Sequence, residues 1–270
     1  MRRAVVFPGQ GSGGSEGSGE VREAVRACVG GGEMPYQLSV FAGCVDLLYE
    51  MREAGVEPDV VAGHSLGEYA AAHAAGSLGL WDAVRLVAER DRLMNEAAAE
   101  NPGGMVALIG ADPTHVVRAA EAVEGIVVAA NFNTPRQTVI SGEDGALDAV
   151  GERVGGRRVR LGVAGAFHSP LMAEASLAMD RMLAEVAIKE PSIPMISAMD
   201  GMVLSTAEEV RSALRRQMLS PVRWVMVIER FIDLGVVEIV EAGEDGTLTR
   251  MLRDFRHKEI EARTAGEVLP

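Results

Sequence analysis

Residues 59–69 read DVVAGHSLGEY, and this stretch decides the fold. Asp59–Ala62 carries two adjacent valines and predicts a short buried strand, whereas Leu66–Ala75 is rich in small residues and predicts a helix. Between them, GHSLG at 63–67 matches the Gly-x-Ser-x-Gly pattern of a nucleophile elbow, which requires a strand before it and a helix after it. The glycines permit a tight turn, and the helix N-terminus favours negative charge beside the serine. The pattern predicts a nucleophilic serine, Ser65.

Strand-like and helix-like stretches alternate on both sides of this motif, which favours an α/β fold. Ala4–Phe7 predicts a buried strand that runs into a Gly/Ser-rich tract at 8–19. The start of this tract offers exposed backbone N–H groups, and its end predicts a flexible linker. Other helices are expected from the spacing of apolar residues and from capping residues, at Gln37–Glu53, Leu80–Ala99, Ser169 to about Ala187, Thr206–Leu219, Arg223–Leu234 and Thr247–Phe255.

The middle of the chain differs in the order of its expected strands and helices. Strands are expected at 105–110, 126–131, 137–141 and 158–163, and helices at 113–123 and 146–154. This β-α-β-β-α-β order is that of a ferredoxin-like unit. We therefore expect two units: a core of residues 1–101 and 167–270, and an inserted ferredoxin-like subdomain of residues 102–166.

Composition excludes several classes of protein. The 270 residues include 26 Lys and Arg against 39 Asp and Glu, a formal net charge of −13, which argues against a nucleic-acid binder. No apolar run approaches the ~20 residues that span a bilayer, so no membrane partner is expected. The two cysteines, Cys28 and Cys44, are too few for a disulfide framework or a zinc site, and no metal is expected. These features together predict a cytoplasmic protein.

A nucleophilic serine needs a base, and histidine is the usual one. Of the five histidines, His168 is the best candidate because it follows an apolar stretch and precedes a helix that Ser169 can cap, which places it at a strand-to-helix crossover. His64 is expected on the side of the turn opposite Ser65, and His73 should face away from it.

Two polar residues fall on apolar helix faces. On the Leu80–Ala99 helix, Arg90 lies in line with Val87 and Met94, so a buried guanidinium is expected. Such a group must be paired, either with an internal carboxylate or with the carboxylate of a substrate, and the spacing leaves both possibilities open. Gln217 shares a face with Leu214, so its amide is also expected to point inward.

Together these residues resemble the malonyl-CoA:acyl carrier protein transacylase family. The matching stretches occur in the family's order over most of the chain: 7–12 (FPGQGS), 63–69 (GHSLGEY), the Arg90 helix, 131–133 (NFN), 166–169 (AFHS), 216–217 (RQ) and 221–224 (PVRW). The resemblance implies an α/β-hydrolase-like core with a short parallel sheet and a ferredoxin-like insert. It also implies malonyl transfer from malonyl-CoA to the phosphopantetheine thiol of acyl carrier protein in fatty acid biosynthesis, through a malonyl-serine, with no bound cofactor.

The resemblance also implies a role for each site residue. Ser65 is the nucleophile and His168 the general base. The backbone N–H groups of Gln10 and Leu66 form the oxyanion hole. Arg90 holds the malonyl carboxylate.

Further residues are expected around this centre. The main-chain carbonyl of Gln217 orients His168, in place of a triad aspartate. By the same resemblance Gln37, Phe167 and Asn131 are expected to line the site. Leu66 and Phe167 also fit the family's malonyl-selecting pattern.

Other functions stay open from the sequence. Within the transferases these are a stand-alone polyketide synthase acyltransferase and a malonate decarboxylase transacylase subunit. A serine thioesterase or esterase is disfavoured because no acidic residue between Ser65 and His168 convincingly follows a core strand. A non-catalytic carrier-protein-binding module is disfavoured by the retained Ser65, His168 and Arg90.

Overall fold

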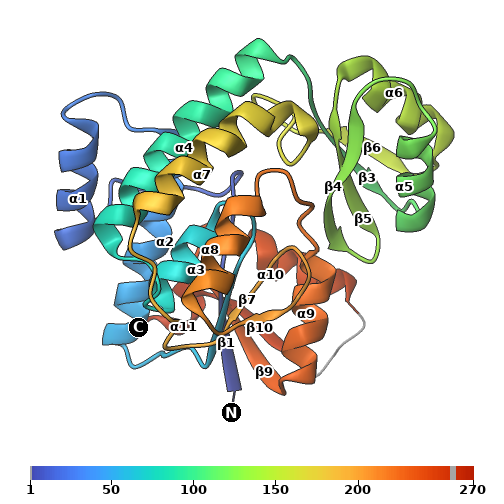
Figure 1. The fold of residues 1–270 in the computed structure, drawn as a ribbon. Coiled ribbons are helices and arrows are strands. Elements are labelled where there is room, and N and C mark those ends of the chain that lie inside the picture. The colour runs from blue at the N-terminus through green and yellow to red at the C-terminus, as the bar shows by residue number, and fades with distance from the viewer. Residues whose placement is uncertain (1, 256–259) are drawn as a thin grey trace.

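The structure is a computed structural model that describes residues 2–255 and 260–270. In this part of the chain the strands form a six-stranded sheet in the order β10-β9-β1-β2-β7-β8 and a four-stranded sheet in the order β4-β5-β3-β6, which confirms the α/β class. The smaller sheet and its helices α5 and α6 stand beside the paired helices α4 and α7 (Figure 1). The elements are β1 (Arg2–Phe7), α1 (Gly19–Val29), α2 (Tyr36–Glu53), β2 (Val60–Gly63), α3 (Gly67–Ala74), α4 (Leu80–Glu100), β3 (Gly104–Ile109), α5 (Pro113–Glu121), β4 (Val127–Thr134), β5 (Gln137–Gly142), α6 (Asp144–Arg153), β6 (Arg157–Arg160), η1 (Pro170–Met172), α7 (Ala173–Glu185), β7 (Met195–Ile196), β8 (Val203–Leu204), α8 (Ala207–Arg216), α9 (Trp224–Asp233), β9 (Val236–Glu241), α10 (Thr247–Met251), η2 (Leu252–Asp254), β10 (Glu261–Thr264) and α11 (Ala265–Val268).

Strand β1 lies in the middle of the larger sheet and sets the position of the site. Val5 and Phe7 belong to the apolar cluster on the face covered by α2, α3 and α4, whereas Ala4 and Val6 belong to the cluster with α9 on the opposite face. Because both faces are covered, the strand is apolar throughout. β1 and β2 run parallel with Phe7 opposite Gly63, so the loop after β1 and the turn after β2 leave the same edge of the sheet.

The prediction of a flexible linker in the Gly/Ser tract is wrong. The Ser15 N–H donates to the Ser39 carbonyl at 3.0 Å, and a Cβ added to Gly14 would lie 2.4 Å from Ser39 Oγ. The tract is therefore packed against α2. It then leads into α1, which was not predicted although its sequence, GEVREAVRACV, holds one glycine and no serine. An apolar face at helical spacing (Val21, Ala24, Val25) packs this helix onto the core.

Other differences concern the ends of elements and polar strands. The helix expected from Ser169 is divided into η1 and α7, while the capping box of Thr206 and Glu209 is confirmed. The edge strand β10 was not predicted because its sequence, EART, carries no apolar alternation. His257 lies outside the described residues. No helix in the described part of the chain is long and apolar enough to cross a membrane.

Candidate active site

The turn after β2 holds Ser65 in a strained conformation. Its φ is +53°, in the left-handed region that residues with a side chain rarely adopt. The two flanking glycines make this turn possible, because a Cβ at Gly63 would lie 2.0 Å from the Gly67 carbonyl carbon and one at Gly67 would lie 2.1 Å from the Phe7 carbonyl oxygen. Strain of this kind concentrates at functional sites. The turn projects the Ser65 hydroxyl from the edge of the sheet at the start of α3.

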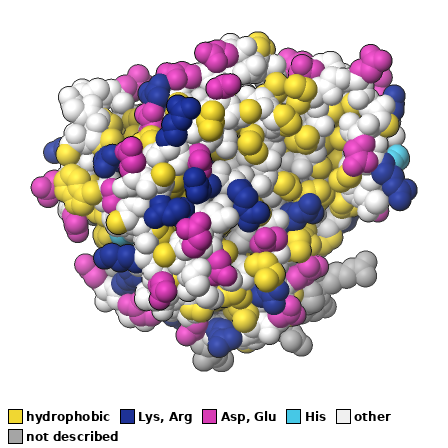
Figure 2. Space-filling view, in the orientation of Figure 1, with side chains coloured by type: hydrophobic (Ala, Val, Ile, Leu, Met, Phe, Trp, Pro, Cys, Tyr) yellow, Lys and Arg dark blue, Asp and Glu magenta, His cyan; other side chains and the backbone are white. Residues whose placement is uncertain are grey.

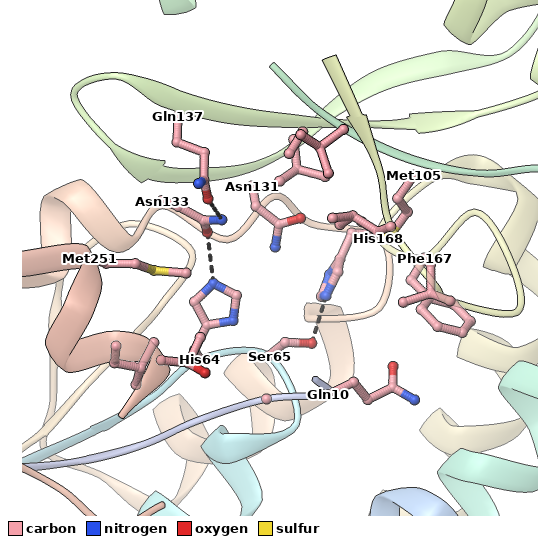
Figure 3. Close-up of a pocket in the computed structure, with 18 of the residues that line it drawn as sticks. Gln10, His64, Ser65, Met105, Asn131, Asn133, Gln137, Phe167, His168 and Met251 are labelled. Carbon is pink, nitrogen blue, oxygen red and sulfur yellow. Dashed lines mark hydrogen bonds between the residues drawn. The ribbon is translucent and has the colours of Figure 1, made fainter. Parts of the chain in front are cut away.

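His168 lies beside this hydroxyl, with Nε2 2.7 Å from Ser65 Oγ (Figure 3). Its Nδ1 lies 2.8 Å from the Gln217 carbonyl oxygen and 3.0 Å from that of Ser220. Carbonyl oxygens only accept, so Nδ1 carries the hydrogen and Nε2 is free to take a proton from Ser65. Burial and the positive charge of Arg90 lower the pKa of His168 to about 4. The imidazole is therefore a neutral base near neutral pH.

Arg90 is completely buried and points its guanidinium at the same centre. Its Nη2 lies 3.3 Å from Ser65 Oγ, its Nε donates to Gln217 Oε1 at 3.2 Å, and its Nη1 donates to Gln37 Oε1. Among the described residues no carboxylate lies within 4.0 Å of this guanidinium, so the internal ion pair left open by the sequence is absent there. A buried cation held only by neutral oxygens is suited to receive an anion.

Two backbone N–H groups are available beside the serine. In the described part of the chain, neither the Leu66 N–H nor the Gln10 N–H donates to a protein acceptor. Leu66 precedes the first turn of α3. Gln10 lies in the loop after β1, the strand that pairs with β2. The Tyr36 hydroxyl steadies the Gln10 loop, accepting from the Gly11 N–H and donating to the Ser12 carbonyl, each at 3.0 Å.

A cavity of about 300 Å³ opens over Ser65 and His168, between the larger sheet and the inner face of the smaller one. Gln10, Asn131 and Phe167 line it (Figure 3). Gln37 does not line this cavity and instead contacts Arg90 behind it. Apolar side chains of the smaller sheet supply much of the remaining wall, among them Met105, Ala107, Ile109, Val139 and Val159.

Besides Gln37, the expected position of His64 was wrong, and other residues of the site were overlooked. His64 lines the same cavity as Ser65, and its Nε2 lies 2.9 Å from Asn133 Oδ1 (Figure 3). Asn133 in turn donates to Gln137 Oε1 at 2.7 Å, so a polar chain joins the elbow to the smaller sheet. Glu68 was also overlooked, although a lone carboxyl inside a small-residue helix was a usable signal. His73 faces away, toward Tyr49, as expected.

The fold, together with a Ser–His pair at the elbow, is that of an acyltransferase. Residues 34–268 match the family model described as "Acyl transferase domain". Two relatives named malonyl CoA-acyl carrier protein transacylase are similar: that of Bacillus subtilis is 35% identical over 229 residues, covering 82% of this chain and 72% of its own length, and that of Haemophilus influenzae is 37% identical over 204 residues, covering 73% and 65%. A solved malonyl-transacylase in complex with a type II polyketide synthase acyl carrier protein superposes with a TM-score of 0.89 at 29% identity, covering 100% of this chain and 99% of its own.

The chain belongs to the acyl transferase family, and the expected resemblance to malonyl-CoA:acyl carrier protein transacylases is confirmed.

Proposed function

We propose that this protein transfers the malonyl group from malonyl-CoA to the phosphopantetheine thiol of an acyl carrier protein, in fatty acid biosynthesis. One observation carries the choice of acyl group: the Arg90 guanidinium lies 3.3 Å from the Ser65 hydroxyl and has neutral partners only. A malonyl thioester has its free carboxylate two bonds from the reacting carbonyl, so one substrate spans both groups. The relatives' shared name supports the same reaction.

The transfer proceeds in two symmetric steps. Ser65 Oγ attacks the thioester carbonyl while His168 Nε2 takes its proton, and the tetrahedral oxyanion is held by the N–H groups of Gln10 and Leu66, typically worth ~3 kcal/mol for each donor. Collapse breaks the carbon–sulfur bond, and His168 returns the proton to the departing CoA thiolate. The carrier-protein thiol then attacks the malonyl-serine ester, and the same groups act in reverse.

Hydrolysis is the main competing outcome. A serine hydrolase of this fold uses an Asp or Glu to orient its histidine. Here the Nδ1 of His168 faces the carbonyls of Gln217 and Ser220. This partner set supports transfer, in agreement with the family.

The transfer is tested by mixing the protein with malonyl-CoA and a holo acyl carrier protein and measuring the mass of the carrier. We expect a malonylated carrier, with Ser65→Ala giving none. Free malonate without carrier acylation would contradict the proposal and indicate a thioesterase. Faster malonylation of a polyketide carrier than of a fatty-acid carrier would favour the polyketide alternative, which the solved complex with a polyketide carrier makes relevant.

We also propose the finer architecture implied by the resemblance. The chain order β3-α5-β4-β5-α6-β6 supports a ferredoxin-like subdomain at 102–166, inserted in a core of 1–101 and 167–270. The elbow after β2, in a mainly parallel sheet, supports an α/β-hydrolase-like core. The unpaired thiols of Cys28 and Cys44 support a reducing, cytoplasmic setting. Lys and Arg are interspersed with Asp and Glu on the face shown in Figure 2, so carrier docking there would rest on local contacts.

A further inference from the structure

Glu68 is a buried carboxyl that the proposed chemistry leaves without a role. It lies in the first turn of α3 and is 1% exposed. Its Oε1 accepts from the Ala198 N–H at 3.1 Å, and its Oε2 accepts from Gln217 Nε2 at 3.0 Å. In the described residues no Lys, Arg or His nitrogen lies within 4.0 Å of it. Burial raises the pKa of this carboxyl, while its two hydrogen bonds and the Arg90 charge oppose that rise. Burying an acid without a cation beside it costs free energy, so a structural or functional role is expected for it.

The donors and acceptors around Gln217 form an ordered chain. Arg90 can only donate, so the Gln217 amide must present its oxygen to Arg90 Nε. Its NH₂ group then needs an acceptor on the other side, which Glu68 Oε2 provides at 3.0 Å. An amide turned the other way would place its NH₂ against the guanidinium. The acceptor Oε2 of Glu68 therefore decides which end of the amide Arg90 meets.

Gln217 contacts both Arg90 and His168, because its side-chain amide accepts from Arg90 Nε and its main-chain carbonyl accepts from His168 Nδ1. We propose that Glu68 is a positioning residue: it fixes the Gln217 amide so that the Arg90 fork stays aimed at the acyl carboxylate beside Ser65. This inference rests on the proposed function, since it assigns Arg90 to an acyl carboxylate. Glu68 touches no substrate and acts through Gln217.

The test is a comparison of Ser65 acylation by malonyl-CoA and by acetyl-CoA, which lacks the free carboxylate. Glu68→Gln keeps the side-chain shape but offers only one acceptor oxygen. The Ala198 N–H takes that oxygen, so the new NH₂ turns the Gln217 amide and opposes Arg90. We expect the malonyl-to-acetyl preference in kcat/KM to fall about tenfold, mainly through KM, which is the scale of one hydrogen bond to a charged group.

A double-mutant cycle separates positioning from general damage. In an Arg90→Ala background, Glu68→Gln should leave the malonyl-to-acetyl preference unchanged, because the group that it positions is gone. Glu241→Gln is the matched control: Glu241 is also completely buried and accepts from the N–H and hydroxyl of Thr249, away from Arg90. This control should keep the preference of the parent protein.

Equal losses with both thioesters, or losses that add to those of Arg90→Ala, would overturn the positioning role. If Glu68→Gln does not fold, Gln217→Met removes the same acceptor from Arg90 and should show the same selective loss; an unchanged preference there would also overturn it. If the parent protein forms acetyl-Ser65 but no malonyl-Ser65, that result would instead contradict the proposed function.

Discussion

Ser65 and His168 share an unusual backbone state, with φ values of +53° and +59°. Each is held in the left-handed region by the turn that joins a strand or loop to a helix, so the two side chains are aimed by the backbone. Two backbone carbonyls complete this arrangement: that of Gln217, the C-cap of α8, and that of Ser220 in the turn after it.

Replacing Arg90 tests the choice of acyl group. Arg90→Ala should lower kcat/KM for malonyl-CoA by about 100-fold, because a buried charge-assisted contact worth ~3 kcal/mol is lost. The rate with acetyl-CoA should change far less or rise, which stopped-flow release of CoA can measure. A parallel loss with both thioesters would show that the guanidinium serves folding instead.

The pH dependence of acylation tests the base. Because burial and Arg90 lower the pKa of His168 to about 4, its neutral form persists well below the ordinary value of 6.5. The acidic limb of kcat/KM should therefore lie near pH 4 to 5. The acidic limb of kcat should lie at higher pH, because the carboxylate of the bound malonyl group offsets the Arg90 charge that opposes protonation of His168. A single limb near 6.5 in both profiles would contradict the burial of this base.

The site residues differ in how far sequence could reveal them. Local patterns reveal Ser65, His168 and Arg90. Ser65 completes the Gly-x-Ser-x-Gly motif, His168 precedes a capped helix, and Arg90 is a charged residue on an apolar helix face. The hydrogen bonds from His64 to Asn133 and from Gln217 to Glu68 join residues far apart in the chain, and no local spacing encodes such pairs.

At the scale of elements, the elbow depends on the close approach of α3 to β1. A Cβ at Gly67 would meet the backbone of Phe7, which cannot move without disturbing the centre of the sheet. Long periodic helices such as α4 were predictable because a 3.6-residue period persists over many turns. The polar edge strand β10 depends on tertiary contacts and was not predictable, whereas α1 was missed although its apolar residues have helical spacing.

Substituting alanine for glycine at two helical positions tests this packing. Gly67→Ala should lower the midpoint of thermal unfolding by several degrees and abolish acylation, since it forces Ser65 from its position. Gly145→Ala is the control, because a Cβ at that position of α6 meets nothing within 4 Å. It should stabilise the protein by up to ~1 kcal/mol. Normal acylation by Gly67→Ala would contradict the role given to this close approach.

At the scale of the whole molecule, the cavity lies where the smaller sheet meets the edge of the larger one. His168 is buried and His64 and His73 are half-buried, and burial lowers the pKa of all three side chains. Folding therefore favours the neutral form of each imidazole, which links the stability of the fold to pH.

The free energy of unfolding should therefore fall as pH drops. The unfolded chain, with histidine near 6.5, binds more protons than the folded one, so stability decreases from about pH 6.5 toward the lowered pKa values. His168 alone accounts for on the order of 3 kcal/mol of this loss. Urea unfolding at pH 7 and pH 5 should show a shallower decrease for His168→Asn than for the parent protein. An identical decrease would mean that His168 titrates normally in the folded state.

The central claim is that Ser65 carries the acyl group, and intact-protein mass spectrometry after mixing with malonyl-CoA tests it most directly. We predict that the parent protein gains the mass of one malonyl group and releases CoA, while Ser65→Ala gains nothing. A malonyl adduct on Ser65→Ala, or neither adduct nor CoA release from the parent protein, would contradict the claim.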